Sequence, residues 1–118
     1  MRKDPYSYVR RNRRRWGLTQ RELALLLGLS SSSAVSRIER SKRTPSAAAL
    51  IACSIVFGLS VPELFPLLQQ EIEEAVLGMA KELYEGLDAK NDKQWELKRK
   101  LFNEILARVI KHRSQKDV

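Results

Sequence analysis

Apolar residues in the first half of the chain recur at helical spacing on both sides of a short glycine- and serine-rich break. The stripe before the break consists of Leu23, Ala24, Leu26 and Leu27. A helix would bury such a stripe on one face. Gly28 then suits the left-handed turn that commonly ends a helix. Beyond a run of serines, Val35 and Ile38 lie three residues apart. The pattern predicts two short helices, about 20–27 and 32–41, joined by a tight turn.

Capping residues and apolar runs place three further helices around this pair. Thr19 and Glu22 have the spacing of a capping box, in which each side chain accepts a hydrogen bond from the other residue's backbone amide. Gly17 should end a helix that precedes them, and Ser46 should cap one that follows. The predicted helices cover about residues 6–16, 20–27, 32–41, 47–57 and 61–65. The fourth helix is apolar nearly all round, which predicts that it is buried.

The last part of the chain shows two longer amphipathic stripes. The first consists of Leu68, Ile72, Ala75, Val76, Met79, Leu83 and Leu87. Its alternating spacings of four and three predict a helix of about 20 residues, with glutamates such as Glu73 on the outer face. The second stripe, on a helix of about 93–112, consists of Trp95, Leu97, Leu101, Phe102, Ile105, Leu106, Val109 and Ile110. The exposed residues of that helix are mostly basic, so the acidic and basic helices should form an antiparallel hairpin.

Together these patterns predict an all-α fold. We expect a five-helix domain at 1–66 and an α-helical hairpin at 67–118. Two helices alone cannot cover both of their apolar stripes, so the hairpin needs a further surface. That surface is a second copy of the hairpin in a four-helix bundle, the chain's own first domain, or another protein. We favour self-association. The interface would then use Leu68, Ile72, Val76, Met79, Leu83, Leu101, Phe102, Ile105 and Val109.

The helix at 32–41 has two unlike sides. Val35 and Ile38 point inward, while the other side carries only small polar and guanidinium groups. That polar side consists of Ser32, Ser33, Ser36, Arg37 and Arg40. A helix that is buried on one side and polar on the other has the form needed to enter a groove of a larger molecule.

These segments resemble the helix-turn-helix of the phage repressor and Cro-like regulators, the xenobiotic-response-element family. The matching blocks are Gly17-Leu18-Thr19-Gln20, Glu22-Leu23-Ala24, Gly28-Leu29-Ser30, Ser36-Arg37-Ile38-Glu39, Lys42-Arg43-Thr44-Pro45-Ser46 and Leu59-Ser60-Val61-Pro62-Glu63-Leu64-Phe65. They occur in order at nearly the family spacing, over about residues 6–66. The resemblance implies that the chain binds double-stranded DNA and that the helix at 32–41 is its recognition helix. It also implies that Arg10 or Arg13 pairs with Glu39.

The same helix supplies the candidates for reading bases. We expect Ser32, Ser33, Ser36 and Arg37 to lie at base edges, with Arg37 carrying most of the readout because arginine can donate two hydrogen bonds to guanine. Phosphate contacts would fix the register without specifying sequence. The phosphate candidates are Gln20, Arg21, Arg13, Arg14, Arg40, Lys42 and Arg43; for Gln20 the contact is implied by the resemblance.

The distribution of charge supports a nucleic-acid partner. The net charge is +8, and residues 1–46 hold 12 basic and 3 acidic residues, a net charge of +9. Residues 47–118 hold 10 basic and 11 acidic residues. All the excess positive charge therefore lies on the half that carries the helix-turn-helix, and DNA accounts for both the charge and the shape.

Little in the composition suggests catalysis. One cysteine and one histidine, His112, cannot form a four-ligand zinc site within the chain, and no phosphate-binding glycine loop or activated nucleophile is present. We expect His112 to be a solvated helix end and Cys53 to be a buried apolar residue. The expectations are no cofactor, no metal, no enzymatic activity, no membrane insertion and a cytoplasmic location.

Two functional hypotheses follow from the sequence. The first is a sequence-specific transcriptional regulator, a repressor by preference, that binds an inverted-repeat operator as a dimer. The second is a protein-interaction or antitoxin-like module whose hairpin at 67–118 binds another protein.

Overall fold

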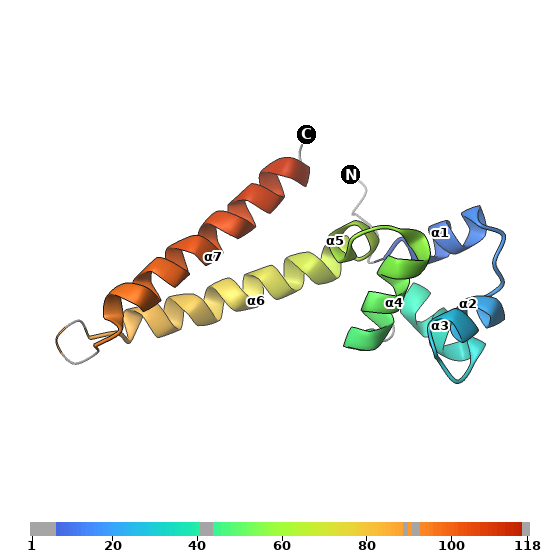
Figure 1. Cartoon of the computed structure of the whole chain (residues 1–118), viewed down its shortest axis with the longest axis horizontal. Helices are drawn as coiled ribbons and strands as arrows, with labels where there is room; N and C mark the ends of the chain where they lie inside the picture. Colours follow the sequence, from blue (N-terminus) through green and yellow to red (C-terminus); the bar gives the residue numbers. More distant parts are fainter. Residues whose placement is uncertain (1–6, 41–43, 89, 91–92, 117–118) are drawn as a thin grey trace. The chain divides into compact units, whose positions relative to one another are not determined.

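Helices are the only regular secondary structure over the residues that the structure describes. The structure is a computed structural model, and it describes residues 7–40, 44–88, 90 and 93–116. The helices are α1 (Val9–Arg15), α2 (Gln20–Leu26), α3 (Ser32–Glu39), α4 (Ala47–Phe57), α5 (Val61–Leu64), α6 (Pro66–Glu85) and α7 (Trp95–Lys116) (Figure 1). The prediction of an all-α chain with a helix-turn-helix domain followed by two long helices is confirmed.

The chain divides into two compact units, Met1–Gln70 and Glu71–Val118. The first contains α1 to α5 and the first turn of α6. It surrounds one apolar core, to which every helix from α1 to α6 contributes. The buried members are Val9, Leu23, Ala24, Leu27, Val35, Ile38, Cys53, Phe57, Leu64, Phe65 and Leu68. Such a core stabilises the unit by removing apolar surface from water.

Local hydrogen bonds set the ends of these helices where the sequence predicted them. The Thr19 hydroxyl accepts from the Glu22 amide at 3.0 Å, and the Glu22 carboxylate accepts from the Thr19 amide at 2.9 Å. Gly17 and Gly28 have φ angles of 70° and 69°, a left-handed conformation that glycine adopts without a steric cost. Both the capping box and the two glycine turns are confirmed.

Two apolar expectations for the first unit are wrong. Leu26 was placed on a buried face, but it is exposed. Helix α4 is not buried all round, because Ile51 and Ile55 are exposed while Ala49, Cys53 and Phe57 face the core. A helix with apolar residues on every side shows no contrast between its faces, so periodicity alone could not identify the side that packs.

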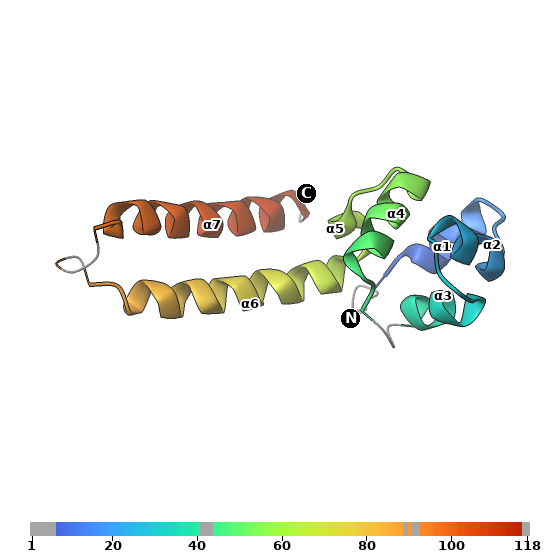
Figure 2. The same cartoon turned by 60° about the horizontal axis from the view of Figure 1, so that its bottom comes forward.

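The second unit is an antiparallel hairpin, as predicted. Helices α6 and α7 lie side by side in both views of the chain (Figures 1 and 2). The rings of Tyr84 and Phe102 stack between them, with centroids 4.9 Å apart. Leu87 and Ile105 line the same small hollow between the helices, and Val109 is buried.

The hairpin also contains a buried polar contact that corrects two expectations. Glu73, expected on the solvated outer face, is buried, and its Oε2 lies 2.8 Å from Nδ1 of His112. His112 is therefore a packing residue between the helices and not a solvated helix end. The neighbouring pair of Glu74 and Arg113 is longer, at 3.7 Å, and lies in solvent.

The predicted hairpin interface contains residues that pack against other parts of the same chain. Leu68 is in the core of the first unit, so it is not available to a partner. Phe102, Ile105 and Val109 face α6, because these positions carry the contacts within the hairpin. The assignments of Leu68 and Val109 are wrong because both side chains are buried within the chain, whereas those of Phe102 and Ile105, which are half-buried, stay predictions. The remaining predicted residues are exposed, namely Ile72, Val76, Met79, Leu83 and Leu101.

None of the helices within the described residues combines the length and the apolar character that crossing a membrane requires.

Candidate DNA-binding surface

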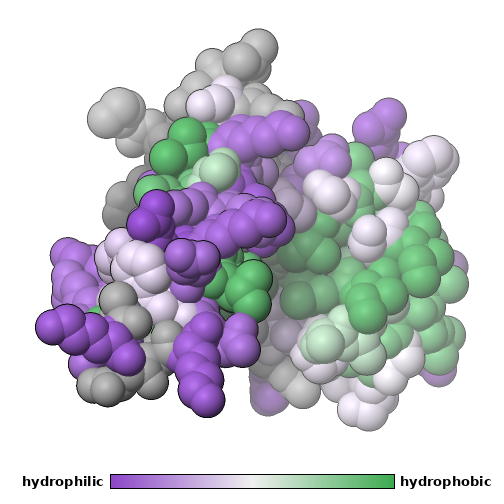
Figure 3. Space-filling model, turned by 60° about the vertical axis from the view of Figure 1, so that its left-hand side comes forward, coloured by the Kyte–Doolittle hydropathy of each residue, from purple (hydrophilic) through white to green (hydrophobic). Residues whose placement is uncertain are grey.

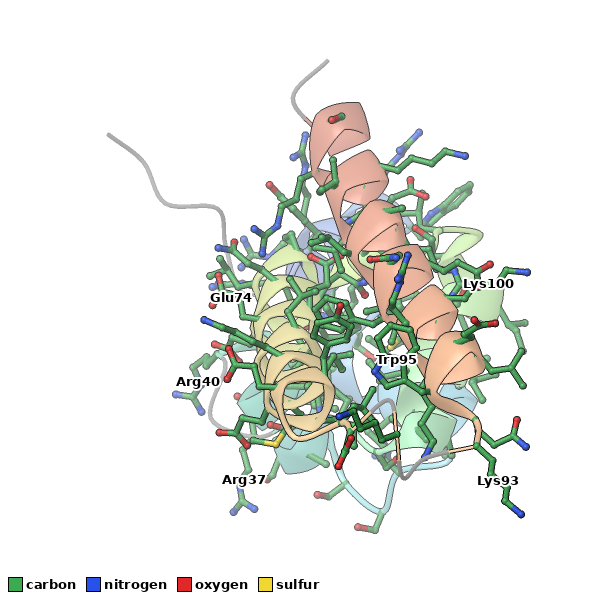
Figure 4. The ribbon with its side chains drawn as sticks, turned by 90° about the vertical axis from the view of Figure 1, so that its left-hand side faces the viewer. Arg37, Arg40, Glu74, Lys93, Trp95 and Lys100 are labelled. Atoms are coloured by element: carbon green, nitrogen blue, oxygen red, sulfur yellow. The ribbon has the colours of Figure 1, made fainter. Side chains whose placement is uncertain are left out.

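Helix α3 presents the polar side that the sequence predicted. Ala34, Val35 and Ile38 are buried against the rest of the first unit. On the other side, Ser36 is half-buried, and the remaining four candidates are exposed: Ser32, Ser33, Arg37 and Arg40. Figure 4 shows the side chains of Arg37 and Arg40 extending away from α3. Among the described residues of the first unit, no other segment buries these four exposed side chains.

A network of charged hydrogen bonds attaches the end of α3 to the two helices before it. The Arg13 guanidinium donates from Nε to Glu39 Oε2 at 2.7 Å and from Nη2 to Glu39 Oε1 at 3.2 Å. Gln20 Nε2 donates to the same Oε1 at 3.1 Å. The Glu39 side chain is only 2% exposed and that of Arg13 only 11%. The predicted pairing of Glu39 with an arginine of the first helix is confirmed, and the residue is Arg13.

This network changes the role expected for Arg13. Its third nitrogen, Nη1, donates to the carbonyl oxygen of Leu18 at 2.9 Å, so all three guanidinium nitrogens already have partners. Arg13 is therefore first a positioning residue that holds α1, α2 and α3 together. Its assignment as a phosphate contact stays a prediction, and the exposed Arg10, Arg14 and Arg40 are the stronger candidates.

An open hollow of about 600 Å³ lies where α1, α2 and α3 meet. Its lining consists of Arg10, Arg13, Arg14, Thr19, Gln20, Ser36, Glu39 and Arg40. The hollow thus brings together four arginines from α1 and the end of α3, and only one acid, which Arg13 neutralises. A concave basic surface beside a recognition helix attracts an anionic ligand such as a phosphate backbone.

The five arginines of α1 fall into two groups. Arg10, Arg13 and Arg14 line the hollow. Arg11 instead lies over the ring of Tyr8, 5.7 Å from its centroid, and Arg15 lies over the ring of Trp16 at 5.9 Å. Cation–π contacts of this kind satisfy part of the charge within the protein itself. The two groups carry the same charge but only the first faces the hollow.

Three predicted phosphate contacts remain, namely Arg21, Lys42 and Arg43. Arg21 is exposed on α2 but does not line the hollow, and Lys42 and Arg43 lie outside the described residues. Sequence analysis missed two lining residues, Arg10 and Thr19, as phosphate candidates. The signal was available for Arg10, because it lies four residues before Arg14 and so occupies the same side of α1.

The Cys53 thiol is buried in the core of the first unit. Burial raises the pKa of the Cys53 thiol to about 11, which keeps it protonated at neutral pH. Within the described parts of the chain, no group of three or more His, Cys, Asp and Glu residues is placed to hold a metal ion.

We predict that Glu39→Ala destabilises the first unit by about 3 kcal/mol, because it leaves the enclosed Arg13 guanidinium without its partner. Denaturant unfolding followed by circular dichroism measures this loss. The matched control is Arg108→Ala, which removes the exposed pair with Glu104 at 3.6 Å and should cost less than about 1 kcal/mol. Equal effects of the two substitutions would contradict the role given to Glu39.

Comparison with known proteins agrees with this geometry. Residues 9–64 match the helix-turn-helix family, a range that begins with α1 and ends with α5. The same comparisons found no matching curated protein and no matching solved structure. The matched range contains α2, the turn at Gly28, α3 and the Arg13–Glu39 pair. Residues 9–64 therefore form a helix-turn-helix domain of the Cro and phage-repressor type.

Proposed function

We propose that the protein is a transcriptional repressor that binds a specific inverted-repeat operator as a dimer, with α3 in the major groove. The observation that carries this proposal is the uncovered serine and arginine side of α3, on a unit whose sequence holds the chain's excess positive charge. The major groove admits an α-helix and presents a different pattern of donors and acceptors for each base pair.

Direct readout rests mainly on Arg37. Its planar guanidinium donates two parallel hydrogen bonds to O6 and N7 of guanine, whereas a serine hydroxyl donates or accepts with several bases. Ser32 and Ser33 begin α3, and Ser36 lies on the same side of the helix as these two. The three serines are short, so they let the helix approach the base edges closely.

Backbone contacts surround this readout. Arg10 and Arg14 line the hollow beside α3 and would bind the phosphates next to the bases that Arg37 reads. Arg40 lies one helical turn beyond Ser36 and would continue the same row. Gln20, which lines this hollow and donates a hydrogen bond to Glu39, would also contact a phosphate. Arg21, Lys42 and Arg43 complete the proposed set of phosphate contacts.

A second copy of the domain would read the second half of an inverted repeat. In helix-turn-helix dimers the two recognition helices enter the major groove one helical turn apart, about 34–36 Å, or a multiple of that distance. The twofold symmetry of the protein is then matched by the symmetry of the operator. Binding at such a site would prevent transcription by occupying the DNA.

A second candidate function is binding of another protein through the hairpin. The observation in its favour is the set of exposed apolar side chains on α6 and α7. In that case the helix-turn-helix would attach the partner to DNA or act as part of an antitoxin. A stable complex of the chain with a different protein, and no homodimer in sedimentation, would favour this function over the first.

We predict that Arg37→Ala relaxes base preference at one position of each half-site by about 1–3 kcal/mol, because the bidentate contact to guanine is lost. Competition binding with operator variants measures this change. The control is Arg37→Lys, which retains the charge but not the fork of two donors, and it should also relax the preference. Full base preference in Arg37→Ala would contradict the proposal.

We predict that Arg14→Ala weakens binding to all DNA sequences alike and reduces the slope of log affinity against log salt by about 1, because one phosphate contact is lost. Arg11→Ala removes the same charge from a side chain that lies over the Tyr8 ring and does not line the hollow, so it should change the slope much less. Titrations at several salt concentrations compare the two variants. The arrangement proposed for α1 is wrong if Arg11→Ala has the larger effect.

A further inference from the structure

One side of the hairpin exposes more apolar surface than a solvated helix pair requires. The residues are Ile72, Val76, Met79 and Leu83 on α6, and Leu97 and Leu101 on α7, and each is between 44% and 66% exposed. Figure 3 shows apolar residues of the chain as green areas beside purple charged ones. Surfaces of this kind mark sites that another molecule covers.

The six residues lie on one common side. Tyr84 stacks on Phe102 and Glu73 contacts His112, which identifies the line along which the two helices face each other. At 100° per residue, the α6 stripe lies about 90° around the helix from that contact line. On α7, Leu97 and Leu101 likewise lie about 90° around the helix from the residues that face α6. Because the helices are antiparallel, both rotations lead to the same side of the hairpin. We call these six residues the apolar face.

The two helices carry opposite net charges. Helix α6 contains five glutamates and one lysine, a net charge of −4, and α7 contains seven basic residues and two glutamates, a net charge of +5. At 100° per residue, the charged residues that border the apolar face are Glu82 on α6 and, on α7, Lys100, Glu104, Arg108 and Lys111, so the border is acidic on α6 and net basic on α7. A second hairpin supplies the complementary pattern when its α7 lies over the first α6 and its α6 lies over the first α7.

We propose that a second copy of this chain covers the apolar face, forming a four-helix bundle whose twofold axis runs parallel to the helices. This axis places each α6 against the α7 of the second copy, antiparallel and opposite in charge. A twofold axis perpendicular to the helices would instead stack α6 on α6 and α7 on α7, with like charges opposed. The charge pattern thus selects one of the two symmetric arrangements.

This arrangement determines where the DNA-binding units emerge. Rotation about an axis parallel to the helices does not change the position of a residue along that axis. Both copies of α6 therefore begin at the same end of the bundle. Each helix-turn-helix unit precedes α6 in the chain, and both therefore leave from that end. The perpendicular axis would place them at opposite ends, separated along the bundle by up to the length of α6, about 30 Å for 20 residues. The inference that the two units at this end bind one operator rests on the proposed function.

The same arrangement predicts a charged contact between a residue of one copy and a residue of the second copy. Tyr84 is level with Phe102, and Glu73 is level with His112. Counting from these contacts, Glu82 lies within about one helical turn in height of Lys100 of the second copy. Both residues are on the outer edge of the apolar face, on opposite helices. They form a pair only if α6 lies over α7 of the second copy.

Sedimentation of the full chain tests the surface. The wild type should be a dimer at micromolar concentration, and Met79→Glu should weaken dimerisation at least about tenfold while the helical circular dichroism is retained. Ile110→Glu is the matched control, because Ile110 is equally exposed but lies on the opposite side of the hairpin. A monomeric wild type, a mixed complex with a different protein in its place, or equal disruption by both substitutions would overturn the proposal.

A charge exchange tests the orientation. Glu82→Lys and Lys100→Glu should each weaken the dimer, and the two substitutions together should restore it, since the pair is re-formed with its signs reversed. Failure of the double variant to recover would refute the parallel axis. Binding to a single half-site, measured on the same variants, separates the two proposals: a dimer without DNA preference refutes sequence reading by α3 but leaves the bundle intact, and a monomer that binds a half-site refutes the bundle and the dimeric operator complex but leaves sequence reading by α3 intact.

Discussion

The DNA-binding surface depends on one enclosed carboxylate. Glu39 ends α3, and its two oxygens bind Arg13 of α1 and Gln20 of α2, so one side chain sets the angle of the recognition helix to both preceding helices. An enclosed charge of this kind is costly when left unpaired, which makes alternative orientations of α3 unfavourable. The apolar core supplies most of the stabilisation, but apolar contacts are less directional. Because Arg13 is used in this network, the proposed phosphate contacts beside α3 fall mainly to the exposed Arg10, Arg14 and Arg40.

The two units differ in their net charge and in the kind of surface that they expose. The first unit holds the excess positive charge and exposes a polar helix, which suits a polyanion. The second unit is nearly neutral as a whole but carries opposite charges on its two helices and an uncovered apolar face, which suits a copy of itself. Specific reading of an inverted repeat needs both properties, since one recognition helix contacts only one half-site. The same division explains why the polar side of α3 and the apolar side of the hairpin are both exposed.

Features set by neighbouring residues could be predicted from the sequence, and features set by distant packing could not. The capping box at Thr19 and the turns at Gly17 and Gly28 depend on residues at most three positions apart, and they were predicted correctly. The pair formed by Glu73 and His112 joins residues 39 positions apart and depends on the register of the hairpin, so the pattern of charges assigned both to solvent. The exposure of Ile51 and of Leu26 also depended on which side of each helix faces the core. For the DNA-binding surface, the side of α3 was predictable from its spacing, whereas the separation of Arg11 from Arg14 required the geometry of α1.

Selection of bound sites from a random DNA pool by the wild-type chain tests the central claim most directly, namely that the outer side of α3 reads sequence. The account predicts enrichment of one motif at physiological salt, an inverted repeat whose half-sites are centred about 10 base pairs, or a multiple of one helical turn, apart. Recovery of sequences that are indistinguishable from the starting pool would contradict it, because charge alone would then account for all binding.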